Sequence, residues 1–130
     1  MCWELGHFQA PMFIEEPQEA PTKPYMLVCI DMASTAIMGS GLVLNPASPQ
    51  GLLSLLVDSM EKSLVGGGAP ILPQSVRLDD PAAFELVGRE LEQLGVQVEL
   101  VKRLPALREF KKIIEHDFFS RQKGYAGKAN

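Results

Sequence analysis

Two neighbouring aspartates, Asp79 and Asp80, have the clearest potential for chemistry in this sequence, because they stand where the apolar segment "SVRLD" ends. Carboxylate oxygens are the ligands that Mg²⁺ prefers, so a carboxylate at a strand end could bind such an ion. Asp80 directly precedes Pro81, a pair typical of helix starts, and we expect it to be a helix cap. Strand alternation directs Asp79 to the opposite side. Asp79 is therefore either a second acidic group favoured by the helix N-terminus or a metal ligand.

Two further carboxylates, Asp31 and Glu115, could join such a site. Asp31 comes late in the most hydrophobic segment of the chain, where a buried carboxylate without partners would be costly. We expect Asp31 either to be hydrogen-bonded at the turn that follows, which is the favoured role, or to face a shared acidic cleft. Glu115 stands beside Lys111 and Lys112, so it forms either a surface ion pair or part of the site.

Other reactive side chains form no recognisable constellation. His7 and His116 have no second histidine or cysteine at metal-ligand spacing. Two cysteines are too few for a disulfide framework, and Cys29 fits a small buried hydrophobe. No apolar run approaches the roughly 20 residues that span a bilayer. These features predict a cytoplasmic protein without membrane association.

The elements that must position these residues follow from hydrophobic patterning. At 130 residues we expect one domain over residues 1–120, with residues 121–130 as a flexible basic tail. Apolar segments predict strands at 2–8, 25–33, 36–44, 75–79 and 96–101. Helices are expected from Ser48-Pro49 to the triple glycine at 66–68, from Pro81 to Gly95, and from Pro105 onward. The sequence therefore predicts an α/β mixed sheet of five strands, an antiparallel meander followed by two parallel strands, with helices on both faces.

Each expected helix carries an apolar stripe at helical spacing. The predicted stripe residues are Leu53, Leu56, Val57, Met60 and Leu64; Phe84, Val87, Leu91 and Leu94; and Leu107, Phe110, Ile114 and Phe118. In the strand at 36–44, Gly39 and Gly41 indicate a bulge or a close approach of another backbone.

Charge is distributed unevenly along the chain. Residues 101–130 hold eight basic and three acidic residues, whereas residues 1–100 hold four basic and thirteen acidic residues. Arg108, Lys111 and Lys112 on the last helix are the candidate face for nucleic acid or an acidic protein. The simpler interpretation is a solvated helix, and a pI near 5.1 argues against general nucleic-acid binding.

Three stretches, "YMLVCIDMASTAIMGSGLVL", "RLDDPAAFELVGRELEQLGV" and "FKKIIEHDF", resemble the retroviral integrase and transposase branch of the ribonuclease H-like fold. The resemblance runs from Trp3 to about Phe118 and implies that fold. It also implies two catalytic and metal-binding carboxylates, Asp79 and Glu115, with thirty-five residues between them. The chain is also similar to uncharacterised bacterial domains of this size.

The first carboxylate of that family falls on Gly6, three residues after Trp3. Glycine cannot bind a metal ion, and loss of one ligand usually empties a Mg²⁺ site. Glu4 is on the same strand face as Gly6, but it is about 7 Å away along the strand, which makes it a poor substitute.

These observations favour a catalytically degenerate domain that works as a binding or interaction module, with a protein or nucleic-acid partner and no cofactor. The alternative is a Mg²⁺- or Mn²⁺-dependent nuclease or DNA strand-transferase that uses Asp79 and Glu115, with Asp31 or Glu4 completing the site. A third hypothesis is a scaffold that self-associates through a sheet edge.

Overall fold

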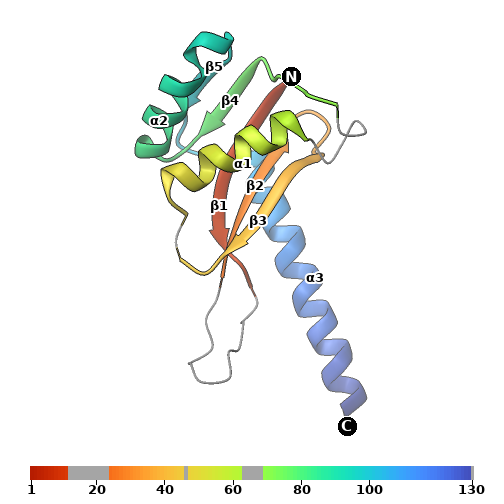
Figure 1. Ribbon diagram of the computed structural model, residues 1–130. Coiled ribbons are helices and arrows are strands. Elements are labelled where there is room, and N and C mark those ends of the chain that lie inside the picture. The colour runs from red at the N-terminus through yellow and green to blue at the C-terminus, as the bar shows by residue number, and fades with distance from the viewer. Residues whose placement is uncertain (12–23, 46, 63–68, 130) are drawn as a thin grey trace.

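The computed structural model describes residues 1–11, 24–45, 47–62 and 69–129, with side chains up to residue 117 (Figure 1). The triple glycine at 66–68 and the side chains of Leu64 and Phe118 lie outside the described residues. The strands are β1 (Cys2–Gln9), β2 (Tyr25–Asp31), β3 (Ile37–Val43), β4 (Ser75–Leu78) and β5 (Gln97–Leu100). The helices are α1 (Pro49–Glu61), α2 (Pro81–Leu91), the 3₁₀ turn η1 (Glu92–Leu94) and α3 (Pro105–Ala129).

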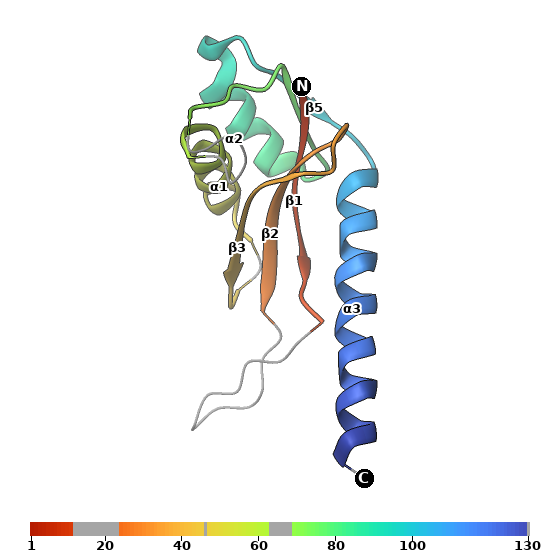
Figure 2. The same ribbon diagram turned by 90° about the vertical axis from the view of Figure 1, so that its right-hand side faces the viewer.

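The five strands form one sheet in the order β3-β2-β1-β4-β5. The pairs β1–β2 and β2–β3 are antiparallel, and the pairs β1–β4 and β4–β5 are parallel. Helices α1 and α2 cover one face and α3 covers the other (Figure 2). The predicted mixed sheet with helices on both faces is therefore confirmed. Because β3 and β5 are the edge strands, the predicted self-association through a sheet edge would use one of them.

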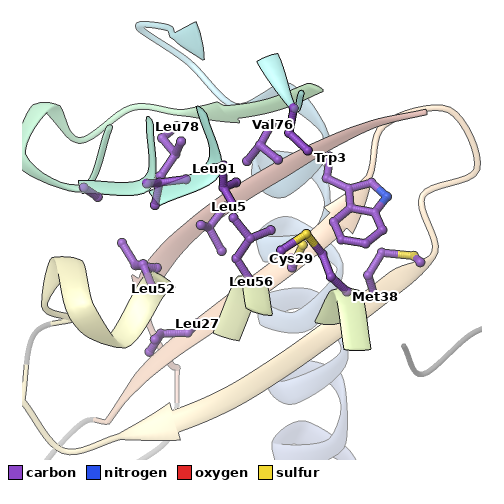
Figure 3. Packing of buried hydrophobic residues seen from close by; sticks show 14 residues of the cluster. Trp3, Leu5, Leu27, Cys29, Met38, Leu52, Leu56, Val76, Leu78 and Leu91 are labelled. Atoms are coloured by element: carbon purple, nitrogen blue, oxygen red, sulfur yellow. The ribbon is translucent and has the colours of Figure 1, made fainter. Parts of the chain in front are cut away.

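The larger core lies between the sheet and the helices α1 and α2. Figure 3 shows Trp3, Cys29 and Leu56 packed together in this layer, and all three are fully buried. The α1 stripe differs in phase from the prediction, because Leu52 is buried while Leu53 is only partly so. Leu94, predicted in the α2 stripe, is half exposed, since α2 ends at Leu91 and the 3₁₀ turn rotates Leu94 away from the core.

The smaller core lies between the sheet and the first turns of α3. It contains Phe8, Val28, Ile30, Leu104 and Leu107. Beyond these turns α3 continues past the ends of the strands in both views (Figures 1 and 2). Its backbone stays helical through residue 129, so most of the segment predicted as a tail is helical, which suits a stretch without proline. The flexibility of that segment and the domain boundary at residue 120 stay predictions.

Gly39 allows α1 to approach β3 closely. A Cβ atom at this position would lie 2.2 Å from Oγ of Ser59, whereas one at Gly41 would meet nothing within 4 Å. The Ser59 hydroxyl is buried and donates to the Leu55 carbonyl at 2.7 Å, so it cannot turn away freely. The register of β2 and β3 shifts beside Gly39, between Cys29 and Ile30. The register shift beside Gly39 fits the predicted bulge, and the close neighbour there is the Ser59 side chain of α1 and not another backbone. At Gly41 the prediction of a close approach is wrong.

Substituting Gly39→Ala is expected to lower the free energy of unfolding by about 1–3 kcal/mol, because the added methyl overpacks the contact with Ser59. Gly41→Ala, in the same strand, is the matched control. It should be neutral or stabilising by up to about 1 kcal/mol, because the unfolded chain loses freedom without a clash. Urea unfolding of both variants measures the difference. Equal effects would show that the Gly39 contact does not constrain the packing of α1.

Candidate functional site

The candidate site lies where β4 ends beside the middle of β1. These strands are parallel, and Glu4 pairs with Arg77. Two residues further along each strand, Gly6 and Asp79 therefore stand at the same level of the sheet. In open α/β sheets, ligands bind outside the carboxyl ends of the strands at such a point, where the chain connections diverge to opposite sides.

Gly6 is covered directly by α3. A Cβ atom at Gly6 would lie 2.6 Å from Cδ2 of Leu107 and 2.8 Å from Cδ1 of Leu104. Both leucines are buried and belong to the smaller core. The position at which the resemblance to integrases places a first carboxylate is therefore covered by the side chains of Leu104, directly before α3, and Leu107.

Glu4 forms the cap of α3. It is fully buried, and its Oε1 accepts from the Leu107 amide at 2.8 Å while Oε2 accepts from the Ala106 amide at 3.2 Å. A helix leaves its first amides without internal partners, and a carboxylate there is also favoured by the helix dipole. Both oxygens of Glu4 are thus used by the first turn of α3.

This role of Glu4 was not predicted from the sequence. The signal available was indirect: Leu104, directly before Pro105, cannot cap a helix through its side chain. The amides of the first turn of α3 therefore needed an acceptor from elsewhere. Without the pairing of strands, nothing in the sequence points to a residue more than one hundred positions earlier.

Asp31 has the turn role that the sequence favoured. Its Oδ2 accepts from the Ser34 amide at 2.9 Å and from the Ser34 hydroxyl at 2.6 Å. Asp31 pairs with Trp3 on β1, whereas Val28 pairs with Gly6. Those pairs are three residues apart, about 10 Å along the strand, so Asp31 lies away from the level of Asp79.

Asp80 was predicted from the sequence to cap α2. Oδ1 of Asp80 accepts a hydrogen bond from the Ala82 amide at 3.3 Å, as such a cap does.

Asp79 lines a cleft of about 250 Å³ beside the end of β1. The cleft is bounded by residues from β1, from the end of β4, from the segment after β5 and from α3. They are His7, Phe8, Asp79, Lys102, Arg103, Leu104, Leu107, Arg108 and Lys111.

Glu115 does not line this cleft. Its Oε1 lies 3.9 Å from Nζ of Lys111, one turn earlier on α3, in a partly exposed pair. Among the described residues, no three histidine, cysteine, aspartate or glutamate side chains are close enough together to hold a metal ion. Lys111 lines the cleft together with Asp79, and it is also the ion-pair partner of Glu115.

The predicted partner face divides in two. Arg108 and Lys111 line the cleft. Lys112 does not line it, and its Nζ lies 3.5 Å from Oε1 of Glu109.

Lys102 and Arg103 were not predicted from the sequence as site residues. They follow β5, which lies parallel beside β4, and the carboxyl ends of parallel strands meet at one edge. Strand order would have placed them near Asp79.

Cys29 does not supply a nucleophile. Burial raises the pKa of its thiol to about 12, opposed by a hydrogen bond with Ser59. The thiol therefore stays protonated at neutral pH, and the expectation of a small buried hydrophobe fits its place in the larger core.

A second, larger cavity of about 370 Å³ lies between α1 and α2. Most of its walls are apolar, with Leu53, Val57 and Leu94 among them, and its charged groups are Glu61 and Glu90. None of its lining residues lines the cleft beside Asp79. In the part of the chain that the structure describes, no helix is both long and apolar enough to cross a membrane. The cytoplasmic location stays a prediction.

Comparison with solved structures confirms the predicted fold. The crystal structure of the catalytic core domain of BIV integrase is similar to this chain with a TM-score of 0.54 and 11% sequence identity. The similarity covers 98% of this chain and 72% of that one. The five-stranded α/β sheet is thus the ribonuclease H-like fold of integrase cores.

Two sequence comparisons complete this result. A family model described as "Domain of unknown function (DUF6930)" matches residues 1–115. No curated protein matches the sequence.

Proposed function

This chain belongs to the family DUF6930, and from its own site we propose that it is a catalytically degenerate integrase-like domain that acts as a binding and interaction module. The observation that carries the proposal is the cover over Gly6. Where a metal-dependent enzyme of this fold needs a carboxylate, the side chains of Leu104 and Leu107 fill the space.

The residues around the cleft do not fit the divalent ions that the fold implies. Catalysis by such ions needs several converging oxygen ligands. Glu4 uses both oxygens as a cap, and Asp31 lies about 10 Å away at the turn. Asp79 alone faces the cleft among four cationic side chains, which repel a divalent cation.

The same charges support an anionic partner. Four basic residues around one carboxylate give the cleft a positive charge on a chain whose net charge is −4. A strongly basic cleft attracts anions and raises their local concentration. A nucleic acid or an acidic protein fits this surface, and the module requires no cofactor.

The alternative of a Mg²⁺- or Mn²⁺-dependent nuclease or strand-transferase has one observation in its favour. Asp79 stands at the end of β4, where the resemblance to integrase cores implies a catalytic carboxylate, on the matching fold. In that mechanism Asp79 and Glu115 would bind the ion that activates a nucleophile and stabilises the leaving oxygen.

A titration with Mn²⁺, followed by amide NMR on wild type and Asp79→Asn, tests the proposal. We expect no local broadening around Asp79, Asp31 or Glu115 at millimolar metal, and no cleavage of DNA or RNA with Mg²⁺ or Mn²⁺. Broadening at Asp79 that the substitution removes, together with strand cleavage that it abolishes, would establish the enzyme instead.

A further inference from the structure

We infer that the cleft between the end of β4 and the first turns of α3 binds a phosphate group through Lys102, Arg103, Arg108 and Lys111, without a metal ion. This inference rests on the proposed binding function and names the chemistry of the ligand. Phosphate can come from a nucleic-acid backbone or from a free phosphate, and the experiment below separates the two.

The cations reach the cleft from two directions. Lys102 and Arg103 come from the segment that joins β5 to α3, and Arg108 and Lys111 come from α3 itself. Arg108 and Lys111 are three residues apart, so they are neighbours on one face of the helix. The four side chains thus surround one space of about 250 Å³.

Three of these cations lack a carboxylate partner. Among the described side chains, no ion pair involves Lys102, Arg103 or Arg108, although Arg77 and Lys112 each have one. Lys111 has only its partly exposed pair with Glu115, and such pairs contribute about 0–1 kcal/mol. A ligand anion can displace Glu115 from Lys111 at little cost.

The walls of the cleft strengthen its charge. Phe8, Leu104 and Leu107 supply apolar surface beside the cationic groups. Apolar walls of low dielectric concentrate the field of charges that line a cleft. Two guanidinium groups add paired donors that match phosphate oxygens, and a phosphate group can carry two negative charges where a carboxylate carries one.

The two acidic residues make this inference distinguishable from a metal site. Asp79 repels phosphate and Glu115 competes for Lys111. Asp79→Asn and Glu115→Gln should therefore strengthen phosphate binding. In a metal-dependent enzyme both carboxylates would hold the ion that contacts the phosphate, and the same substitutions would weaken or abolish binding.

The experiment is a titration of the chain with inorganic phosphate and, separately, with a short single-stranded oligothymidylate, in EDTA, followed by amide NMR. We expect shifts centred on Asp79, Lys102 and Arg103. Arg103→Ala should weaken binding about tenfold, as loss of one charge-assisted contact does. Asp79→Asn should tighten binding several-fold. Arg89→Ala, which removes a cation from α2 outside the cleft, should have little effect.

Each outcome has a distinct meaning. Cleft shifts with both probes indicate that free phosphate suffices, and cleft shifts with the oligonucleotide alone indicate a backbone phosphate; either supports the inference. No cleft shifts with either probe, or equal effects of Arg103→Ala and Arg89→Ala, would overturn the inference and leave the proposed module intact. Binding that appears only in a parallel titration with Mg²⁺ in place of EDTA, and that disappears in Asp79→Asn, would overturn both.

Discussion

Restoring the missing carboxylate by Gly6→Asp is expected to lower the free energy of unfolding by about 3–5 kcal/mol, the cost typical of an uncompensated buried charge. The new Cβ would lie within 3 Å of Leu104 and Leu107, and the carboxylate would enter a cluster of apolar side chains. Urea unfolding followed by circular dichroism measures the loss.

Gly6→Ala separates the steric cost from the cost of the charge. It adds the same Cβ without the carboxylate, and overpacking of this kind costs about 1–3 kcal/mol. In a Leu107→Ala background the contact at 2.6 Å is gone, so the added methyl should be much less costly there. If Gly6→Asp folds as stably as wild type, the cover over Gly6 is loose, and the main support for lost catalysis disappears.

Removing the cap by Glu4→Ala is expected to cost about 2–4 kcal/mol of unfolding free energy, because two helix amides lose a charged acceptor in a buried place. The substitution also leaves a cavity in β1, where the Glu4 side chain is fully buried. The measurement is again urea unfolding, combined with hydrogen exchange at the amides of Ala106 and Leu107.

Glu4→Gln is the matched control, because it keeps the shape and one acceptor oxygen. It should cost less than Glu4→Ala, and one of the two amides should keep its protection from exchange. A general loss of stability would speed exchange throughout the sheet, whereas loss of the cap affects the start of α3 first. Unchanged exchange at both amides in Glu4→Ala would show that the cap does not hold α3.

Features set by neighbouring residues could be predicted from the sequence. The strands followed from apolar segments, and the helix start at Ser48-Pro49 and the cap Asp80 followed from the proline that comes next. The turn role of Asp31 followed from the cost of burying it alone. In each case the deciding partner lies within a few residues along the chain.

Features set by distant pairing could not be predicted. The cap by Glu4 joins residues 103 positions apart, and the cleft combines β1, the end of β4, the segment after β5 and α3. The phase of the α1 stripe also depended on which side faces the sheet, so Leu52 was missed. The glycine at position 6 suggested a lost ligand, but the leucines that cover it became visible only once α3 was placed.

The position of β1 has a consequence for the order in which the chain folds during synthesis. β1 emerges first and lies at the centre of the sheet, but its neighbour β4 and its cover from α3 come from the later part of the chain. Until the first turn of α3 emerges, Glu4 keeps a charge that prefers water between Trp3 and Leu5, which are both buried in the folded protein. That charge should delay the pairing of β1 with other strands while α3 has not yet emerged from the ribosome. The contact between Glu4 and the first turn of α3, which joins distant parts of the chain, then forms last and completes the cover of the central strand. Late formation of such contacts is typical of folding that is slow because of topology.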